Sequence, residues 1–133
     1  MMPRLPDWQT RLGAWLASIA RRPFGYGSHD CALFAAGAIE ALTGVDHAAD
    51  WRGRYKTQIG GLRVLRRAGF ADHIALARSL CPPIHTPRPG DLAIVDTPLG
   101  LALGVVQGAH IYAPAEVGWG LVPRSAAIEF LEV

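Results

Sequence analysis

The chain has 133 residues and a formal net charge of +2, which fits one domain with its own core and gives no reason to expect nucleic-acid binding. Its two cysteines do not make a disulfide framework, and no apolar run approaches the ~20 residues that span a membrane. No signal peptide is recognisable at the start. We therefore expect one cytoplasmically made domain, residues 1–133, that binds no nucleic acid and spans no membrane.

Helices are predicted in the first part of the chain, about residues 5–80. Asp7 is placed to cap the first helix and Pro23 to stop it, Gly44 ends the second, and Asp72 is placed to cap the fourth. The second helix is apolar on nearly all sides, so we expect it to be central and the most buried. The expected helices cover about residues 8–22, 31–43, 57–68 and 73–80.

Strands are predicted in the last part, about residues 90–133. Short segments rich in valine and isoleucine alternate there with glycine and proline, the pattern of an antiparallel sheet with tight turns. The expected strands cover residues 92–96, 101–107, 109–113, 120–122 and 128–133. Helices followed by strands predict an α+β domain in which N-terminal helices pack on a C-terminal antiparallel sheet.

Cys31 is the first candidate site residue because it opens the second helix directly after a glycine-rich bend, residues 24–30. The N–H groups and the positive dipole end of a helix favour a thiolate, so we expect a lowered pKa and a nucleophilic role. The same N–H groups are candidates to hold an oxyanion. The alternative is that Cys31 is a small buried residue that packs the start of the helix.

Three short motifs give the chain a family resemblance. Asp30-Cys31 opens the central helix, Arg88-Pro89-Gly90-Asp91-Leu92 opens the first strand, and Gly104-Val105-Val106-Gln107-Gly108 leads to a later strand. This arrangement resembles the NlpC/P60 family of papain-like cysteine peptidases. Residues 27–34, 50–55 and 65–70 are also similar to a family of small proteins encoded among the tail genes of phages and prophages. The second similarity covers about residues 22–133.

The resemblance implies a Cys-His catalytic site, but this chain departs from it. Peptidases of the NlpC/P60 kind carry the base histidine just before the Val-Gly of the second strand, and lining up Gly104 with that glycine puts Ala102 at this position. An alanine takes no proton. The third position of the triad, which orients the histidine, falls near Tyr112.

Two histidines are candidates to replace the missing base. His110 shares a strand face with Tyr112 and would reach Cys31 from a neighbouring strand, or it is a solvent-bonded edge residue. His29 lies two residues before Cys31, where its ring either contacts the thiolate or satisfies a backbone carbonyl. The sequence leaves both pairs of alternatives open.

A zinc site is an alternative to consider because His29, Cys31, Cys81 and His85 supply two nitrogens and two sulfurs, the ligand types of tetrahedral zinc. Structural zinc sites usually contain a Cys-x₂₋₄-Cys knuckle, whereas one pair here straddles a helix start and the other a rigid diproline. The spacing therefore predicts no metal and no other cofactor.

These observations predict an NlpC/P60-like protein of a phage or prophage tail tip that acts in tail assembly or cell-wall penetration with a degenerate catalytic site. The alternative is an active thiol hydrolase, a murein endopeptidase or amidase that uses Cys31. The resemblance implies other tail-tip or baseplate proteins as partners and peptidoglycan as a candidate ligand. It implies a location in the host cytoplasm during assembly and in the virion tail afterwards.

Overall fold

The computed structural model describes residues 3–133, which form four helices and five strands. An α+β fold is thus confirmed, with every expected helix and strand present within a few residues of its predicted bounds. Within residues 3–133 no helix is long and apolar enough to cross a membrane. In chain order the elements are α1 Trp8–Ile19, α2 Cys31–Thr43, α3 Gln58–Arg67, α4 His73–Leu80, β1 Leu92–Thr97, β2 Gly100–Val106, β3 His110–Pro114, β4 Trp119–Pro123, a short 3-10 turn Arg124–Ala126, and β5 Ala127–Leu131.

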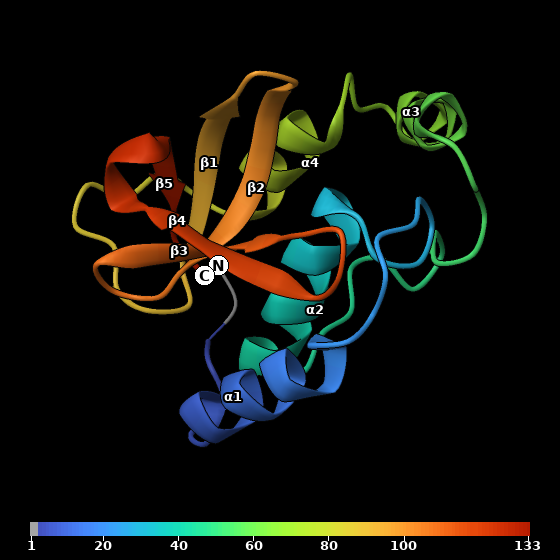
Figure 1. Ribbon diagram of the computed structural model, residues 1–133. Coiled ribbons are helices and arrows are strands. Elements are labelled where there is room, and N and C mark those ends of the chain that lie inside the picture. The colour runs from blue at the N-terminus through green and yellow to red at the C-terminus, as the bar shows by residue number, and fades with distance from the viewer. Residues whose placement is uncertain (1–2) are drawn as a thin grey trace.

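The five strands make one antiparallel sheet in the order β4-β3-β2-β1-β5 (Figure 1). β1 and β2 pair along their whole length, from Leu92 opposite Val105 to Thr97 opposite Gly100. β2 and β3 pair over a much shorter stretch, Val105–Tyr112 and Val106–Ile111. β2 therefore extends well beyond its ladder with β3, on the side of the molecule where α4 lies.

α2 is the central helix, as its composition predicts. Phe34, Ile39 and Leu42 are buried and belong to one core cluster with residues of α1, α4 and the helix-facing side of the sheet. A smaller cluster, which includes Ala93 and Ile111, covers the other side of the sheet. Because α2 contacts both α1 and β2, its first residue, Cys31, is held against the middle of the sheet.

Asp30, Thr57 and Asp72 cap α2, α3 and α4, each accepting a hydrogen bond from a backbone N–H three residues on. Gly44 ends α2 in the left-handed conformation, with φ of 81°. The predicted cap at Asp7 is wrong, since its side chain makes no capping hydrogen bond. Its backbone, with φ of −99° and ψ of 26°, is not extended as it is in a normal N-cap, so its side chain is not aimed at the first turn.

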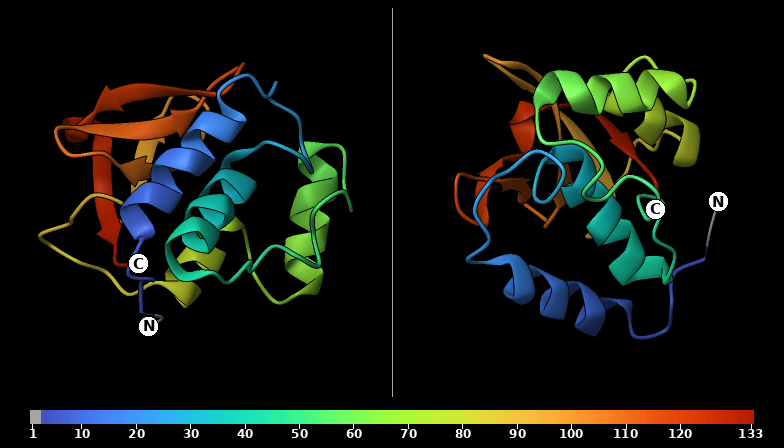
Figure 2. Two further views of the ribbon diagram at one scale, coloured as in Figure 1. Left: turned by 90° about the horizontal axis from the view of Figure 1, so that it is seen from below. Right: turned by 90° about the vertical axis from the view of Figure 1, so that its right-hand side faces the viewer.

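The two ends of the described chain meet beside the sheet (Figure 2). Arg4 donates to the Val133 carbonyl at 2.9 Å and to the fully buried Asp91 at 2.9 Å. Asp91 also accepts hydrogen bonds from the backbone N–H groups of Arg88 and Val133. The Pro-Gly-Asp motif that opens β1 thus ties the N-terminal segment and the C-terminus to the sheet.

α3 lies at the periphery of the molecule, away from the sheet (Figure 1). Of its ten residues only Gly61 is buried, where it packs closely on the Tyr55 ring. Arg63, Arg66 and Arg67 are exposed and form a basic outer face. The other side of α3 faces a pocket that it shares with α2, α4 and β2.

Candidate functional site

Asp30 fixes the position of Cys31. Its carboxylate accepts hydrogen bonds from Leu33 N–H at 3.0 Å, from Gly27 N–H at 2.9 Å and from the Tyr55 hydroxyl at 2.7 Å. Gly27 has a φ of +87°, and a Cβ there would collide with the Tyr55 carbonyl, so the bend requires glycine. The carboxylate thereby joins the bend, the helix start and the segment before α3 around the thiol.

The Cys31 thiol is half-buried against β2. Burial raises its pKa, and the nearby Asp30 carboxylate raises it further, while a hydrogen bond from the Leu103 backbone acts in the opposite direction. The predicted lowering of the Cys31 pKa is therefore wrong. The helix terminus does favour a thiolate, but the loss of solvent and a negative neighbour outweigh it.

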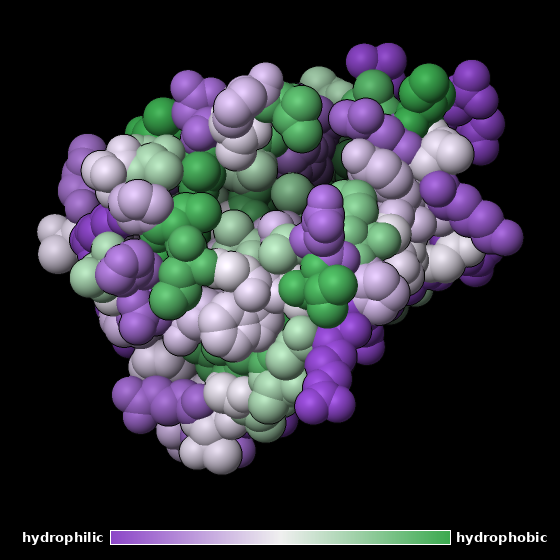
Figure 3. Space-filling view, in the orientation of Figure 1, coloured by the Kyte–Doolittle hydropathy of each residue, from purple (hydrophilic) through white to green (hydrophobic). Residues whose placement is uncertain are grey.

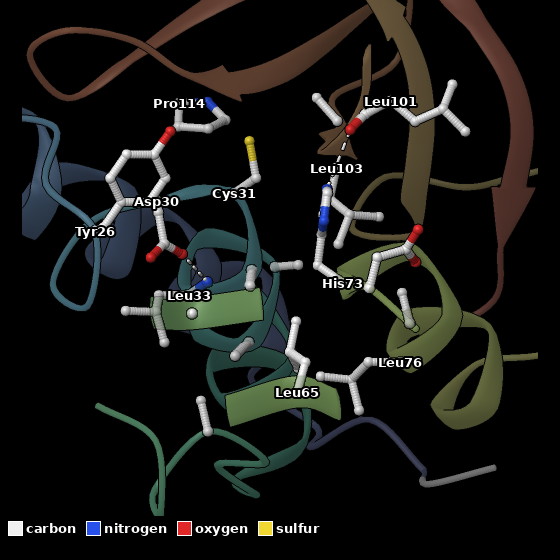
Figure 4. Close-up of a pocket in the computed structure, with 18 of the residues that line it drawn as sticks. Tyr26, Asp30, Cys31, Leu33, Leu65, His73, Leu76, Leu101, Leu103 and Pro114 are labelled. Atoms are coloured by element: carbon white, nitrogen blue, oxygen red, sulfur yellow. Dashed lines mark hydrogen bonds between the residues drawn. The ribbon is translucent and has the colours of Figure 1, made fainter. Parts of the chain in front are cut away.

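The thiol opens into a pocket of about 680 Å³, visible as a hollow beside β2 and α4 in Figure 3. Most of the lining is apolar and comes from α2, α3, α4 and the first half of β2 (Figure 4). The segment that joins α2 to α3 adds Trp51 and Tyr55 to the lining. A volume of this size accommodates a small organic ligand.

The lining includes Ala102, the position at which the family resemblance leads us to expect a base. Pro114 of β3 also lines it. Continuing the β2–β3 register by two residues from Val105–Tyr112 places Pro114 opposite Leu103. Proline has no N–H to give to the ladder, so pairing stops there, and the thiol of Cys31 lies beside the end of the ladder. Neither Ala102 nor Pro114 has a group that transfers a proton.

His29 is buried and serves the backbone. Its Nε2 is 2.7 Å from the Gly118 carbonyl oxygen, and its ring packs edge-on against Phe34. It does not line the pocket. Of the two roles left open by the sequence, the structure has His29 bonded to a backbone carbonyl.

His110 and Tyr112 also lie outside the pocket lining. His110 is exposed at the start of β3, opposite Pro123. It is four residues from Pro114, a distance of about 13 Å along a strand. Tyr112 packs edge-on against Trp119, with ring centroids 5.1 Å apart. The structure thus brings neither side chain to Cys31.

His73 is a site residue that the sequence analysis missed. It is the first residue of α4, lines the same pocket as Cys31, and has its Nε2 3.1 Å from the Leu101 carbonyl oxygen. The sequence marks it as the residue after a helix cap, Asp72, and nothing local connects it to a cysteine 42 positions earlier. The approach of α4 to β2 creates that connection.

No grouping of three or more His, Cys, Asp or Glu side chains within residues 3–133 is arranged to hold a metal ion. Of the four candidate zinc ligands, His29 is bonded to Gly118 and Cys81 lies in the core cluster. His85 is exposed in the connector before β1.

We expect iodoacetamide to alkylate Cys31 faster than Cys81 in the native protein at neutral pH. Cys31 opens into the pocket, whereas Cys81 is 2% exposed and burial raises its pKa to about 11. Mass spectrometry of the labelled peptides over time gives the two rates. In guanidinium chloride the rates should converge, and equal slow labelling of both thiols in the native protein would contradict an accessible Cys31.

A family described as a domain of unknown function (DUF6950) matches residues 3–133. No curated protein matches the chain, and no solved structure does. The matched range covers the pocket and every helix and strand described above.

Proposed function

Since the chain belongs to the DUF6950 family, whose description states no activity, we propose from its own site that it is an NlpC/P60-like protein of a phage or prophage tail tip. It acts in tail assembly or in cell-wall penetration, and its catalytic site is degenerate with respect to murein cleavage. In this proposal the fold is a variant of the papain-like fold, with α2 as the cysteine helix and β1 to β3 as the strands that face it.

One observation carries the proposal. Cys31 opens the central helix and faces a pocket whose lining has Ala102 where a peptidase of this kind would have its base. The thiol position of such a site is present and the base position is filled by a methyl group. Without a base at position 102 the mechanism of that family is not available, which supports a binding or structural role in the tail.

The partners proposed are other tail-tip or baseplate proteins, with peptidoglycan as a candidate ligand. The proposed location is the host cytoplasm during assembly and the virion tail afterwards. The exposed basic face of α3, with Arg63, Arg66 and Arg67, is an accessible surface for such contacts.

A second candidate is an active thiol hydrolase that cuts murein peptides or another amide with Cys31. The observation in its favour is that the His73 imidazole lines the same pocket as the thiol. The first-turn N–H groups that Asp30 does not hold are those of Cys31 and Ala32, since Asp30 takes Leu33 and Phe34. These two groups are the donors available to an oxyanion.

We expect the purified protein to release no peptides from peptidoglycan, as measured by mass spectrometry. Loss of one member of a catalytic pair removes most of its rate advantage, so the family's mechanism should not survive with alanine at position 102. We expect the Cys31→Ser variant to enter tails normally by electron microscopy, and deletion of the whole protein to impair tail assembly or infection.

The same assay on Cys31→Ser, His110→Ala, His29→Ala and His73→Ala separates the alternatives. Release of murein peptides by the wild type that disappears in Cys31→Ser would overturn the degenerate site in favour of the hydrolase. The histidine whose substitution also abolishes release would then be the base. Normal tails without the protein would contradict the tail-tip proposal itself.

A further inference from the structure

Two side chains from different helices contact one edge of β2. Gln107 N–H donates to the His110 carbonyl, so the polar backbone groups at this position point toward β3. Backbone N–H and C=O groups point to opposite sides of a strand at successive residues. Leu103 and Leu101 precede Gln107 by an even number of residues, so their backbone groups point to the same side as those of Gln107. The β2–β3 ladder does not extend to either residue, so this part of the edge is open to side chains.

Cys31 and His73 occupy that open edge. The Leu103 backbone adjoins the Cys31 thiol, and His73 Nε2 lies 3.1 Å from the Leu101 carbonyl oxygen. Equivalent atoms two residues apart on a strand are about 7 Å from each other. Figure 4 shows the sulfur on the α2 side and the imidazole on the α4 side of the same pocket. Two hydrogen bonds through one bridging water molecule span about 5 to 6 Å, so the two side chains must turn toward each other within the pocket for a proton to pass.

The hydrogen bond to Leu101 also defines the histidine tautomer. A carbonyl oxygen accepts only, so Nε2 of His73 is the ring nitrogen that carries the hydrogen in the neutral form. Nδ1 is then the basic nitrogen. His73 is held by the strand through one nitrogen and has the other to accept a proton, which is how a general base is usually oriented.

We propose that His73 is the proton acceptor for Cys31 and that the pair hydrolyses esters of aliphatic carboxylic acids whose acyl chain lies in the pocket. The Cys31 proton moves to His73 Nδ1, the sulfur bonds to the acyl carbon, and the C–O bond of the ester breaks as the leaving alcohol takes the proton from Nδ1. Water then attacks the thioester and gives a proton to Nδ1, the C–S bond breaks, and that proton returns to the thiolate.

The lining of the pocket selects the substrate class. Beyond the thiol and the imidazole the walls are mainly aliphatic, including Leu33, Ile39, Leu62, Leu65, Leu76 and Leu80. The two carboxylates in the lining, Asp30 and Asp72, already accept hydrogen bonds at helix starts. Burying murein peptides, with their charged groups, against such walls is costly, whereas an aliphatic chain gains from it.

α3 supplies a second reason to expect an apolar occupant. Leu62, Val64 and Leu65 line the pocket, yet each side chain is only half-buried. Gly61 is the one residue of α3 that is buried. An amphipathic helix normally covers its apolar face. An aliphatic chain in the pocket would cover these three side chains and would link α3 to α2 and α4.

Other titratable groups face the same space and enter any pH dependence. Asp30 and Tyr55 are hydrogen-bonded to each other, and burial together with that bond raises the pKa of Tyr55, so its hydroxyl stays protonated. Tyr26 and His47 line the pocket from its loops, and Asp72 lines it from the start of α4. The position of His47 along α2 differs from that of the thiol, since its neighbour Ala48 packs on Leu33 and Ala36. His73, in contrast, is hydrogen-bonded to β2, the strand beside the thiol.

The test uses p-nitrophenyl butyrate and octanoate with the purified full chain. We expect kcat/KM for octanoate to exceed that for butyrate by at least about tenfold, since each buried methylene contributes up to about fourfold. Leu65→Gln should reduce the octanoate value more than the butyrate value. Cys31→Ser should abolish turnover and the burst of acylation. This assay contains no tail or murein, so its result is independent of the tail-tip proposal.

The role of His73 is tested by His73→Gln, which keeps an N–H donor for the Leu101 carbonyl and removes the base. We expect kcat/KM to fall about 100-fold, and the acid limb of the wild-type pH profile to disappear, because the variant has no base left to protonate. The same substitution at His110, which is exposed and lies outside the pocket lining, is the matched control and should keep the wild-type profile. Absence of esterase activity, or a His73→Gln profile equal to the wild type, would overturn the proposal, and circular dichroism would verify that each variant is folded.

Discussion

Replacing Asp91 with alanine is expected to lower the free energy of unfolding by about 3 to 5 kcal/mol. Asp91 is fully buried and pairs with Arg4, whose side chain is only 4% exposed. Its removal leaves the guanidinium without its counter-charge and leaves the N–H groups of Arg88 and Val133 without their acceptor. The loss is large because the partners stay buried after the carboxylate has gone.

Urea denaturation followed by circular dichroism measures this loss, with Asp96→Ala as the matched control. Asp96 is on the same strand but exposed, so its replacement should change the free energy of unfolding by less than about 0.5 kcal/mol. Equal stabilities of the two variants would contradict the central role of Asp91. Replacing Arg4 and Asp91 together by apolar residues should cost less than Asp91→Ala, because no unpaired charge then remains buried.

Most of the secondary structure follows from local features of the sequence. Asp30, Thr57 and Asp72 each precede a segment of helix formers and cap it in the structure. The strands follow from alternating valine-rich segments between glycines and prolines. Asp7 has the residue type of a helix cap, but capping also depends on an extended backbone conformation, which Asp7 does not adopt.

The properties of the site depend on contacts between distant segments and therefore escaped prediction. Local sequence places Cys31 correctly at a helix start, but its pKa is decided by burial against β2 and by Asp30. Likewise His73 is connected to the thiol through β2, and Asp91 to Arg4 across 87 residues of sequence. Pattern and propensity describe neighbours in the chain, and these pairs are neighbours only in the fold.

Phe34→Ala and Ile39→Ala are each expected to lower the free energy of unfolding, by about 3 to 5 and about 2 to 5 kcal/mol respectively. Phe34 is 1% exposed and its ring centroid lies 5.1 Å from that of Trp15, so the substitution opens a cavity between α1 and α2. Ile39 is 2% exposed in the same core cluster, one and a half turns farther along α2. Neither site can collapse easily, because α2 contacts both α1 and the sheet.

Arg66→Ala is the control for these two variants. Arg66 is exposed on the outer face of α3, and its replacement by a good helix former should change the free energy of unfolding by no more than about 0.5 kcal/mol. Urea denaturation of the three variants under one set of conditions gives the comparison. If Arg66→Ala were the most damaging of them, α3 would be an integral part of the folded core and α2 would not be its centre. That result would also remove the basis for a pocket that α3 borders with a partly uncovered apolar face.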